Sequence, residues 1–278
     1  MSERREVVGL IAGQGLLPLL VAEGIRQSGK RVACIGLRGQ FDPALPALCD
    51  EFAEAGILRL GRWVKIARRF GIREAVMVGR VSKAKMHDPW RIFQDVPDLR
   101  ALLLWYRQLR HDHRTPTLLT ALADNLAQDG VTLIESTRYI TEHLAHAGVM
   151  TKTHPDALQS SDIAFAMPLL EELLRLGIGQ SISVREKDTI AVEALEGTDR
   201  MIARSGELCK AKGWTLLKSA RDDHDRRADV PTIGARTIEN LHAAGGRALA
   251  VGAGKVILLD KPAVIAAADR LSIAIVGI

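Results

Sequence analysis

The sequence predicts an α/β protein of two domains, and three observations lead to this fold class. In the first half, short apolar runs alternate with segments of helical periodicity. Between residues 148 and 161 this regularity lapses into a segment rich in Thr, His, Pro, Asp and Ser. In the second half the apolar runs are shorter and closer together. We therefore expect an N-terminal domain at residues 1–158, a linker helix at 159–177 and a C-terminal domain at 178–278.

The N-terminal half begins with a strand, a turn and a helix. The apolar run at residues 7–12 predicts a buried strand, and a glycine turn then leads into an apolar-periodic helix at 16–27 that closes at Gly29. The alternation continues with strands at 31–35, 75–78 and 131–134 and with helices at 62–70 and 118–128. Because helical crossovers join parallel strands, this half is predicted to be a Rossmann-like parallel sheet covered by helices.

The C-terminal half is predicted to be a mixed α/β domain. Residues 162–176 read as one helix, which we place in the linker. Strands at 181–184 and 189–194 flank a charged turn and predict a hairpin. Further strands are expected at 215–218, 248–251, 256–259 and 273–276, and helices are expected to start near Asp199, Thr237 and Pro262.

Composition narrows the class of protein. A chain of 278 residues suits two domains of common size, and 47% hydrophobic with 26% charged residues excludes a disordered, collagen-like or coiled-coil protein. The three cysteines, Cys34, Cys49 and Cys209, are odd in number and far apart in the sequence. Neither a disulfide framework nor a paired-cysteine zinc site is therefore expected, which favours a reducing cytosol.

The net charge and the hydropathy of the chain indicate which kinds of binding partner it can have. The 38 Lys and Arg residues exceed the 33 Asp and Glu residues by five, so phosphates, acidic lipids and nucleic acid all remain open as anionic partners. The longest uncharged apolar stretch, residues 7–22, is interrupted by Gly13, Gly15 and Pro18. We expect no transmembrane helix, because this stretch is too short and too broken, and no signal peptide, because acidic residues balance the basic ones before it.

The first turn, Gly13-Gln14-Gly15, follows a strand and opens a helix, so its backbone N–H groups could hold a phosphate. A dinucleotide fingerprint would need a small residue where Pro18 stands and an acidic residue at the end of the second strand. Both are missing, which disfavours NAD. A glycine turn that serves only the passage from strand to helix remains an alternative.

Residues 221–229 place four carboxylates and three guanidinium groups in one predicted loop. Carboxylate oxygens suit Mg²⁺, and arginines neutralise phosphate, so phosphoryl chemistry is a natural use of such a loop. A solvated mixed-charge surface loop remains the alternative. Upstream, Glu193 ends the predicted hairpin, and Thr198 is expected to cap the following helix, whose start could also receive an anion.

Residues 100–114 form a basic, amphipathic segment that is rich in Leu and contains Trp105 and Tyr106, and it follows the basic residues Arg80, Lys83, Lys85 and Arg91. Such a segment could lie on an anionic membrane surface, receive an acyl substrate, or pack on the core with a solvated basic face, which is the simplest interpretation. Nucleic acid is disfavoured as a partner, because aromatic residues make up only 4% of the chain and no zinc-finger spacing occurs. Neither a Gly-x-Ser-x-Gly elbow nor a Walker A lysine loop is present.

Three stretches together resemble one family along essentially the whole chain. They are V-V-G-L-I-A-G-Q-G-L-L-P near the start, G-Q-S-I-S-V-R-E-K-D-T-I-A-V-E-A-L-E-G-T-D-R-M-I-A-R-S-G in the middle and K-S-A-R-D-D-H-D-R-R-A-D-V-P-T-I-G-A-R-T-I later. The family is the UDP-2,3-diacylglucosamine pyrophosphatase of lipid A biosynthesis, in the form unrelated to calcineurin-like metallophosphatases. The resemblance implies Mg²⁺-dependent hydrolysis of UDP-2,3-diacylglucosamine to UMP and 2,3-diacylglucosamine 1-phosphate by a two-domain protein. It also implies a cytoplasmic protein that works peripherally on the inner membrane, and it leaves a homodimer open.

The resemblance also carries site residues onto this sequence. Asp225, Arg227 and Asp229 match a Gln-Asp-x-Arg-x-Asp-x-Pro pattern, and Lys218 matches a lysine at the preceding strand end. The implied catalytic residues are Asp225, Arg227 and Lys218, and the implied magnesium ligands are Asp225, Asp229 and Glu193. The implied substrate-binding residues are Gly13, Gln14, Gly15, Gln180, Ser183, Arg185, Gly197, Thr198, Asp199 and Thr232.

The loop departs from the family pattern at one point, because His224 stands where the pattern usually has Gln and residues 221–223 replace Lys-Pro-Asn. The roles of Arg221, Asp222, Asp223 and His224 therefore stay open. Two roles are open for Asp225, as a metal ligand or as a general base toward water. A carboxylate with a pKa of about 4 is a weak base at neutral pH, which favours the metal role. A non-catalytic nucleotide- or lipid-binding protein is the alternative to the enzyme.

Overall fold

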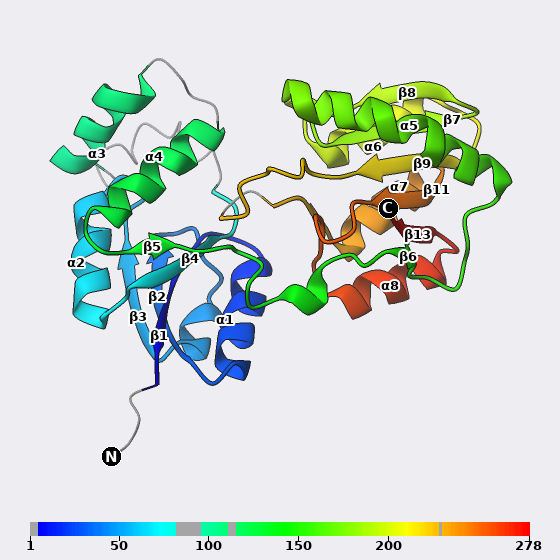
Figure 1. Ribbon diagram of the computed structural model, residues 1–278. Helices are drawn as coiled ribbons and strands as arrows, with labels where there is room; N and C mark the ends of the chain where they lie inside the picture. Colours follow the sequence, from blue (N-terminus) through cyan, green and yellow to red (C-terminus); the bar gives the residue numbers. More distant parts are fainter. Residues whose placement is uncertain (1–4, 82–95, 111–114, 228–229) are drawn as a thin grey trace. The chain divides into compact units, whose positions relative to one another are not determined.

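The computed structural model describes residues 5–81, 96–110, 115–227 and 230–278 (Figure 1). The chain divides into two compact units. Unit 1 comprises Met1–Ile140 with Asp225–Asp229, and unit 2 comprises Thr141–His224 with Val230–Ile278. The division at residue 140 comes earlier in the chain than the expected boundary at 158.

Unit 1 contains a parallel five-stranded sheet in the order β3-β2-β1-β4-β5. The strands are β1 (Val7–Ala12), β2 (Arg31–Leu37), β3 (Glu51–Ala55), β4 (Glu74–Val78) and β5 (Thr132–Leu133). The helical elements are α1 (Leu17–Gln27), η1 (Leu45–Leu48), α2 (Leu60–Phe70), α3 (Leu99–Leu104), η4 (Trp105–Leu109) and α4 (Thr115–Ala127). The predicted Rossmann-like parallel sheet is confirmed.

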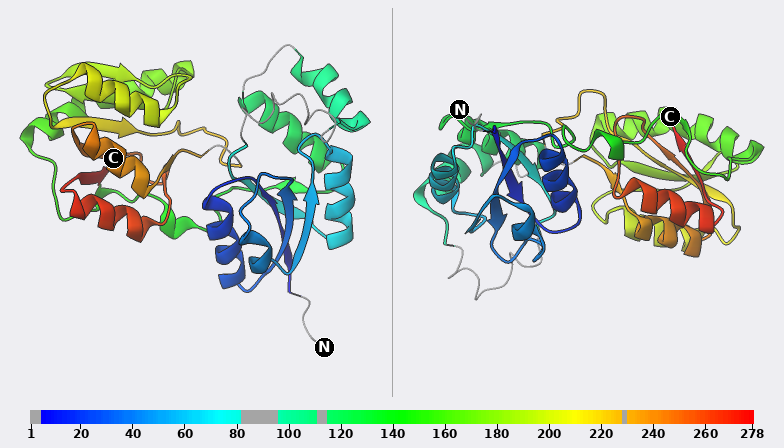
Figure 2. Two further views of the ribbon diagram at one scale, coloured as in Figure 1. Left: turned by 180° about the vertical axis from the view of Figure 1, so that it is seen from behind. Right: turned by 90° about the horizontal axis from the view of Figure 1, so that it is seen from below.

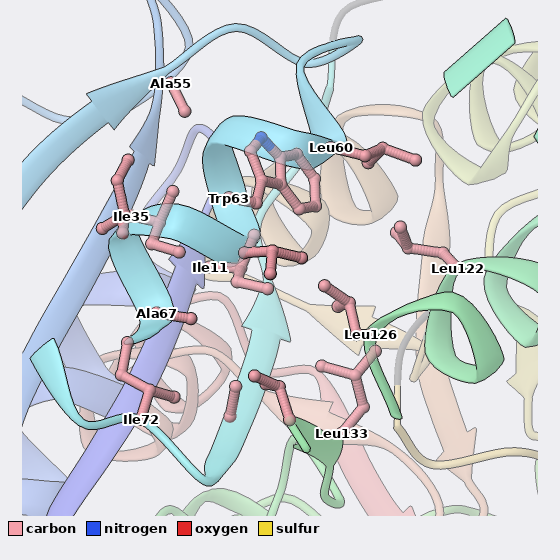
Figure 3. Packing of buried hydrophobic residues seen from close by; sticks show 14 of the residues in the cluster. Ile11, Ile35, Ala55, Leu60, Trp63, Ala67, Ile72, Leu122, Leu126 and Leu133 are labelled. Carbon is pink, nitrogen blue, oxygen red and sulfur yellow. The ribbon is translucent and has the colours of Figure 1, made fainter. Parts of the chain in front are cut away.

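The main core of unit 1 lies between the sheet and the helices α2, α3 and α4. Ile11 and Ile35 of the sheet pack there against Trp63 of α2 and Leu126 of α4 (Figure 3). Successive strand residues point to opposite faces, so Leu10 and Cys34 face the other side of the sheet, where α1 lies (Figure 1). Helices thus cover both faces, as a parallel sheet requires.

Unit 2 contains a six-stranded mixed sheet in the order β6-β13-β11-β9-β7-β8. Its strands are β6 (Gly148–Val149), β7 (Ser181–Arg185), β8 (Asp188–Val192), β9 (Trp214–Lys218), β11 (Gly246–Val251) and β13 (Ala274–Gly277). Strands β9, β11 and β13 are parallel, whereas β7 is antiparallel to β8 and to β9, which confirms the predicted hairpin. A separate parallel pair joins β10 (Thr232–Ile233) to β12 (Ile257–Leu258).

Helices cover both faces of the unit 2 sheet. One face packs against α6 (Thr198–Leu208), α7 (Ala235–Ala243) and α8 (Lys261–Arg270). The other face packs against α5 (Ala157–Leu176), which includes the helix expected as a linker (Figures 1 and 2). Because Ile163, Leu170 and Leu174 bury an apolar stripe against Ile182 and Leu217, this helix belongs to unit 2.

No helix among the described residues is both long and apolar enough to cross a membrane.

Candidate functional site

A buried polar network lies at one edge of the unit 2 sheet. Lys218 ends β9, Ser181 begins β7 beside it, and Glu193 follows β8. Because β7 runs antiparallel to β9 and β8 antiparallel to β7, the topology gathers these residues at the carboxyl edge of the parallel strands. This is the edge at which open α/β sheets bind ligands.

The network is continuous from cation to carboxylate. The Lys218 Nζ atom donates to Thr198 Oγ1 at 2.5 Å, and Thr198 Oγ1 donates to Glu193 Oε1 at 3.0 Å. Ser181 Oγ donates to the other carboxylate oxygen, Glu193 Oε2, at 2.5 Å. Lys218 Nζ lies 3.9 Å from Glu193 Oε2. Each hydroxyl therefore links groups that would be costly to bury alone.

This network is buried, and it pairs an ammonium with a carboxylate, so its formal charges balance. The Lys218 side chain is only 6% exposed and that of Glu193 11%. A lysine so far from water is stable because a carboxylate and hydroxyl groups surround it. Thr198 also begins α6, whose N-terminal N–H groups favour negative charge nearby. The start of α6 is therefore the feature of this edge that favours an anion such as a phosphate group.

Backbone contacts hold the same edge together. Ser219 N donates to the carbonyl of Gln180, and Gly252 N donates to the carbonyl of Lys218. A Cβ on Gly252 would lie 2.2 Å from Ser219 Oγ, so a larger residue there would require the Ser219 hydroxyl to move. Gln180 thus lies at the predicted site, where its carbonyl fixes the turn after β9.

Thr198 does not cap α6 as predicted. Gly197, with a φ of 83°, is the N-cap residue, and Thr198 is the first helical residue. Its hydroxyl is committed to Lys218 and Glu193, so it serves the network instead of the helix end.

Two residues implied by the resemblance, Ser183 and Arg185, lie away from this network. Ser183 is buried inside unit 2, where its hydroxyl contacts Ser205 Oγ of α6 at 2.8 Å. Arg185 is four residues beyond Ser181 along β7, about 13 Å away at the usual rise of a strand, and donates to the Lys212 carbonyl. Asp199 accepts from Asn240 of α7 at 3.3 Å. Thr232 begins the short strand β10.

The Asp225 segment belongs to unit 1. Both the N–H and the hydroxyl of Ser136, just after β5, donate to the Arg226 carbonyl, at 2.8 and 2.9 Å. This double contact fixes the segment near the carboxyl edge of the unit 1 sheet. Lys218 and Asp225 therefore belong to different units, although only six residues separate them in the sequence.

Within this segment, Arg227 forms several hydrogen bonds to the Asp225 carboxylate. Arg227 Nε lies 2.9 and 3.0 Å from the two carboxylate oxygens, Nη2 lies 2.6 Å from Oδ2, and the Arg227 N–H donates to Oδ1 at 3.0 Å. The bond to Asp225 and the nearby charges of Asp225 and Asp124 raise the pKa of Arg227. The side chains are 35% and 39% exposed, so the pair is oriented but open to solvent.

Three other charged residues of this loop, Arg221, Asp222 and Asp223, form separate ion pairs. Arg221 binds the Asp223 carboxylate through two hydrogen bonds of 2.7 and 2.6 Å, and Asp222 pairs with Lys255 at 2.6 Å. Asp229 lies outside the described residues.

The Asp225 carboxylate has the oxygen chemistry that Mg²⁺ prefers, and in this structure Arg227 binds both of its oxygens. This ion prefers hard oxygen ligands and commonly takes one or two protein carboxylates together with phosphate oxygens and water. Asp225 offers such oxygens at a partly exposed position. Both oxygens of Glu193 already accept hydrogen bonds from hydroxyl groups. Among the described residues, no group of three His, Cys, Asp or Glu side chains is placed to hold a metal ion.

The first turn lies where the strand order of unit 1 reverses, between β1 and β4, which is the usual ligand position in such sheets. Its N–H groups are less available than predicted, because Gly13 N donates to the Val78 carbonyl and Gln14 N to the Arg80 carbonyl. Gly13 is required sterically, since a Cβ there would lie 2.8 Å from the Arg80 carbonyl oxygen. Gly15 faces open space with a φ of 105°.

The basic segment packs on the core only in part. Ala101 and Leu104 of α3 are buried, as a core-packed helix requires. The outward face, however, is apolar and aromatic as well as basic, since Leu102, Trp105 and Tyr106 are exposed. Lys83, Lys85, Arg91, His111, His113 and Arg114 lie outside the described residues.

Sequence reasoning missed two residues of these sites. Ser181 stands inside the quoted hairpin motif, and its position two residues before Ser183 places both side chains on one face of β7. That alternation could have identified it. Ser136 carries no local signal, because its contact with Arg226 joins residues 90 positions apart.

Comparisons with known proteins agree with the division of the chain. The family described as the LpxI N-terminal domain matches residues 7–143, and the LpxI C-terminal domain matches residues 146–276. The UDP-2,3-diacylglucosamine pyrophosphatase LpxI of Caulobacter vibrioides is 31% identical over 280 aligned positions, which cover 98% of this chain and 97% of that protein. The chain therefore belongs to the LpxI family.

Proposed function

We propose that this chain hydrolyses the pyrophosphate bond of UDP-2,3-diacylglucosamine, giving UMP and 2,3-diacylglucosamine 1-phosphate, with Mg²⁺ as cofactor. The similarity to the Caulobacter vibrioides pyrophosphatase over nearly the whole chain supports the substrate. The observation that carries the chemistry is the Asp225–Arg227 pair, in which a carboxylate and a guanidinium are fixed in one partly exposed segment.

The reaction needs charge neutralisation before water can attack phosphorus. A diphosphate carries negative charge on both phosphoryl groups, and more gathers on the leaving oxygen in the transition state. Arg227 supplies a guanidinium that Asp225 holds in one orientation. Lys218 supplies a compact ammonium at the edge of the unit 2 sheet. We propose that one of these cations, Arg227 or Lys218, stabilises the developing charge.

We assign Asp225 to holding Mg²⁺, with Asp229 as a further ligand. When bound, the ion would neutralise the diphosphate and polarise its oxygens. The alternative role of Asp225, general base toward water, is less favoured because ordinary carboxylates are weak bases at neutral pH. For Glu193 we propose the positioning of Lys218, since its carboxylate is buried beside that lysine and is linked to it through Thr198.

We propose that the first turn, with Gly15 facing open space, contacts the uridine or its phosphate. Gln180 and Gly197 would line the approach to Lys218 at the unit 2 edge.

The decisive assay uses the purified chain, UDP-2,3-diacylglucosamine and Mg²⁺, with and without EDTA. We expect UMP to appear only when the metal is available, and UDP-glucose, which lacks the acyl chains, to be turned over far more slowly. Substrate binding without any UMP would identify a nucleotide- or lipid-binding protein and refute the enzyme. Running the reaction in ¹⁸O-labelled water would show which phosphorus is attacked.

A further inference from the structure

The outward side of α3 and η4 is an apolar surface with no protein partner among the described residues. We call it the α3–η4 face and define it by Leu99, Leu102, Leu103, Trp105, Tyr106, Arg107 and Arg110. Leu99 is 73% exposed, Tyr106 60%, Trp105 52% and Leu102 50%. Of the 14 large hydrophobic side chains that are exposed in the described part of the chain, six lie between Val96 and Tyr106.

Packing within the described part of unit 1 does not explain these outward residues. Ala101 and Leu104 already bury the inner side of α3 against the core. Asp98 caps the helix by accepting from Ala101 N at 2.9 Å and ties it to α2 by accepting from Gly61 N at 2.6 Å. A helix that only packs on a core carries polar residues on its outer side. Here the outer side carries leucine and aromatic rings, which marks an interaction surface.

The charge on this surface selects the kind of partner. The sequence from 99 to 110 contains three arginines and no acidic residue. Arg100 is paired inward with Asn125 and Asp129, whereas Arg107 and Arg110 are exposed. The Arg110 guanidinium stacks over the Tyr106 ring at 4.7 Å, so aromatic and basic groups form one patch.

We propose that the α3–η4 face binds the surface of an anionic lipid bilayer. Trp and Tyr favour the level of the lipid headgroups, leucines enter the acyl boundary, and arginines pair with anionic headgroups. The two elements together span only residues 99–109, so they lie in the interface instead of crossing it. The proposal deepens the proposed function by naming the surface from which an acylated substrate is taken, but binding itself needs no turnover.

The test is co-sedimentation of the full chain with vesicles, without substrate. One set of vesicles is pure phosphatidylcholine and the other also contains phosphatidylglycerol. Two double variants probe the face: Trp105→Ser with Tyr106→Ser, and Arg107→Gln with Arg110→Gln. Leu208→Ser and Arg270→Gln are matched controls, because both side chains are exposed in unit 2.

We expect wild type to partition onto the anionic vesicles and to be released by salt. The aromatic variant should lose at least about tenfold in partition, and the arginine variant about fivefold for each charge removed. The controls should bind as wild type does. Equal binding to neutral and anionic vesicles, or wild-type partition of both double variants, would overturn the proposal.

If the α3–η4 face bound something other than a bilayer, the double variants would give different results. If the face held the acyl chains of the substrate, the double variants would raise KM for substrate in detergent micelles and leave vesicle partition unchanged. If it held a second copy of the chain, they would lower the molar mass in light scattering and again leave partition unchanged. Either result overturns the proposal. UMP release from micellar substrate reports the proposed function separately, so a failure of one proposal is distinguishable from a failure of the other.

Discussion

Removing either charge of the Lys218–Glu193 pair should destabilise unit 2 strongly, and removing both should cost less than the sum. At the observed 3.9 Å separation, two unit charges attract by about 4 kcal/mol at an effective dielectric constant of about 20. Desolvation offsets much of this attraction in the intact pair. A single variant, however, leaves the other charge buried without its partner, which costs about 3–5 kcal/mol.

We therefore expect Lys218→Met and Glu193→Gln each to lower the free energy of unfolding by about 3–5 kcal/mol. The double variant should lose at least about 2 kcal/mol less than the sum, because neither charge is then left uncompensated. Native-state hydrogen exchange in increasing urea, read in the peptide that contains Trp214–Lys218, measures these values within unit 2.

Lys255→Met is the matched control, since its ion pair with Asp222 joins side chains that are 31% and 92% exposed. It should cost no more than about 1 kcal/mol. Single-variant losses that add to within about 0.5 kcal/mol of the double variant would show that the two charges do not interact, and the role of Glu193 in holding Lys218 would be refuted.

Two other predictions concern unit 1. A hydrogen bond from Cys34 lowers the pKa of the half-buried Cys49 thiol, whereas that bond and burial raise the pKa of Cys34. Alkylation by iodoacetamide, followed by peptide mass spectrometry, should therefore modify Cys49 at a lower pH than an ordinary thiol and should spare Cys34. In Cys34→Ala, the pH at which alkylation of Cys49 is half-maximal should rise. An unchanged half-maximal pH would contradict the interaction between the two thiols. Gly13→Ala should destabilise unit 1 by about 1–3 kcal/mol, because the new Cβ would meet backbone of Gly79 and Arg80 at 2.8–3.0 Å. Gly234→Ala is the comparison, with its closest contact at 4.0 Å, and equal urea midpoints for the two variants would contradict the steric argument.

Local patterns predicted most of the fold. Strand β1, for example, is a continuous apolar run, because helices bury both of its faces. Strand β3 was missed because its sequence, E-F-A-E-A, is short and charged, as suits the edge of a sheet. The expected linker helix was misplaced for another reason: periodicity predicts a helix but does not show which sheet its apolar stripe will bury.

The sites were harder to predict from the sequence, because their residues meet only through the arrangement of the strands. The chemistry of Lys218, Glu193 and Thr198 could be anticipated, but their meeting depends on the antiparallel insertion of β7 and β8. The attachment of the Asp225 segment to unit 1 depends on Ser136, far away in the sequence. Likewise, nothing in the local sequence relates Cys34 to Cys49, although each thiol shifts the pKa of the other.

The turnover number of Asp225→Ala tests the central claim most directly. With saturating UDP-2,3-diacylglucosamine and Mg²⁺, the variant should release UMP at least about a hundredfold more slowly than wild type, equivalent to about 2.7 kcal/mol of transition-state stabilisation, while calorimetry still detects bound substrate. Asp223→Ala, which removes a neighbouring carboxylate that is 73% exposed, should turn over normally. A kcat of Asp225→Ala close to that of wild type would contradict the assignment of this carboxylate to catalysis.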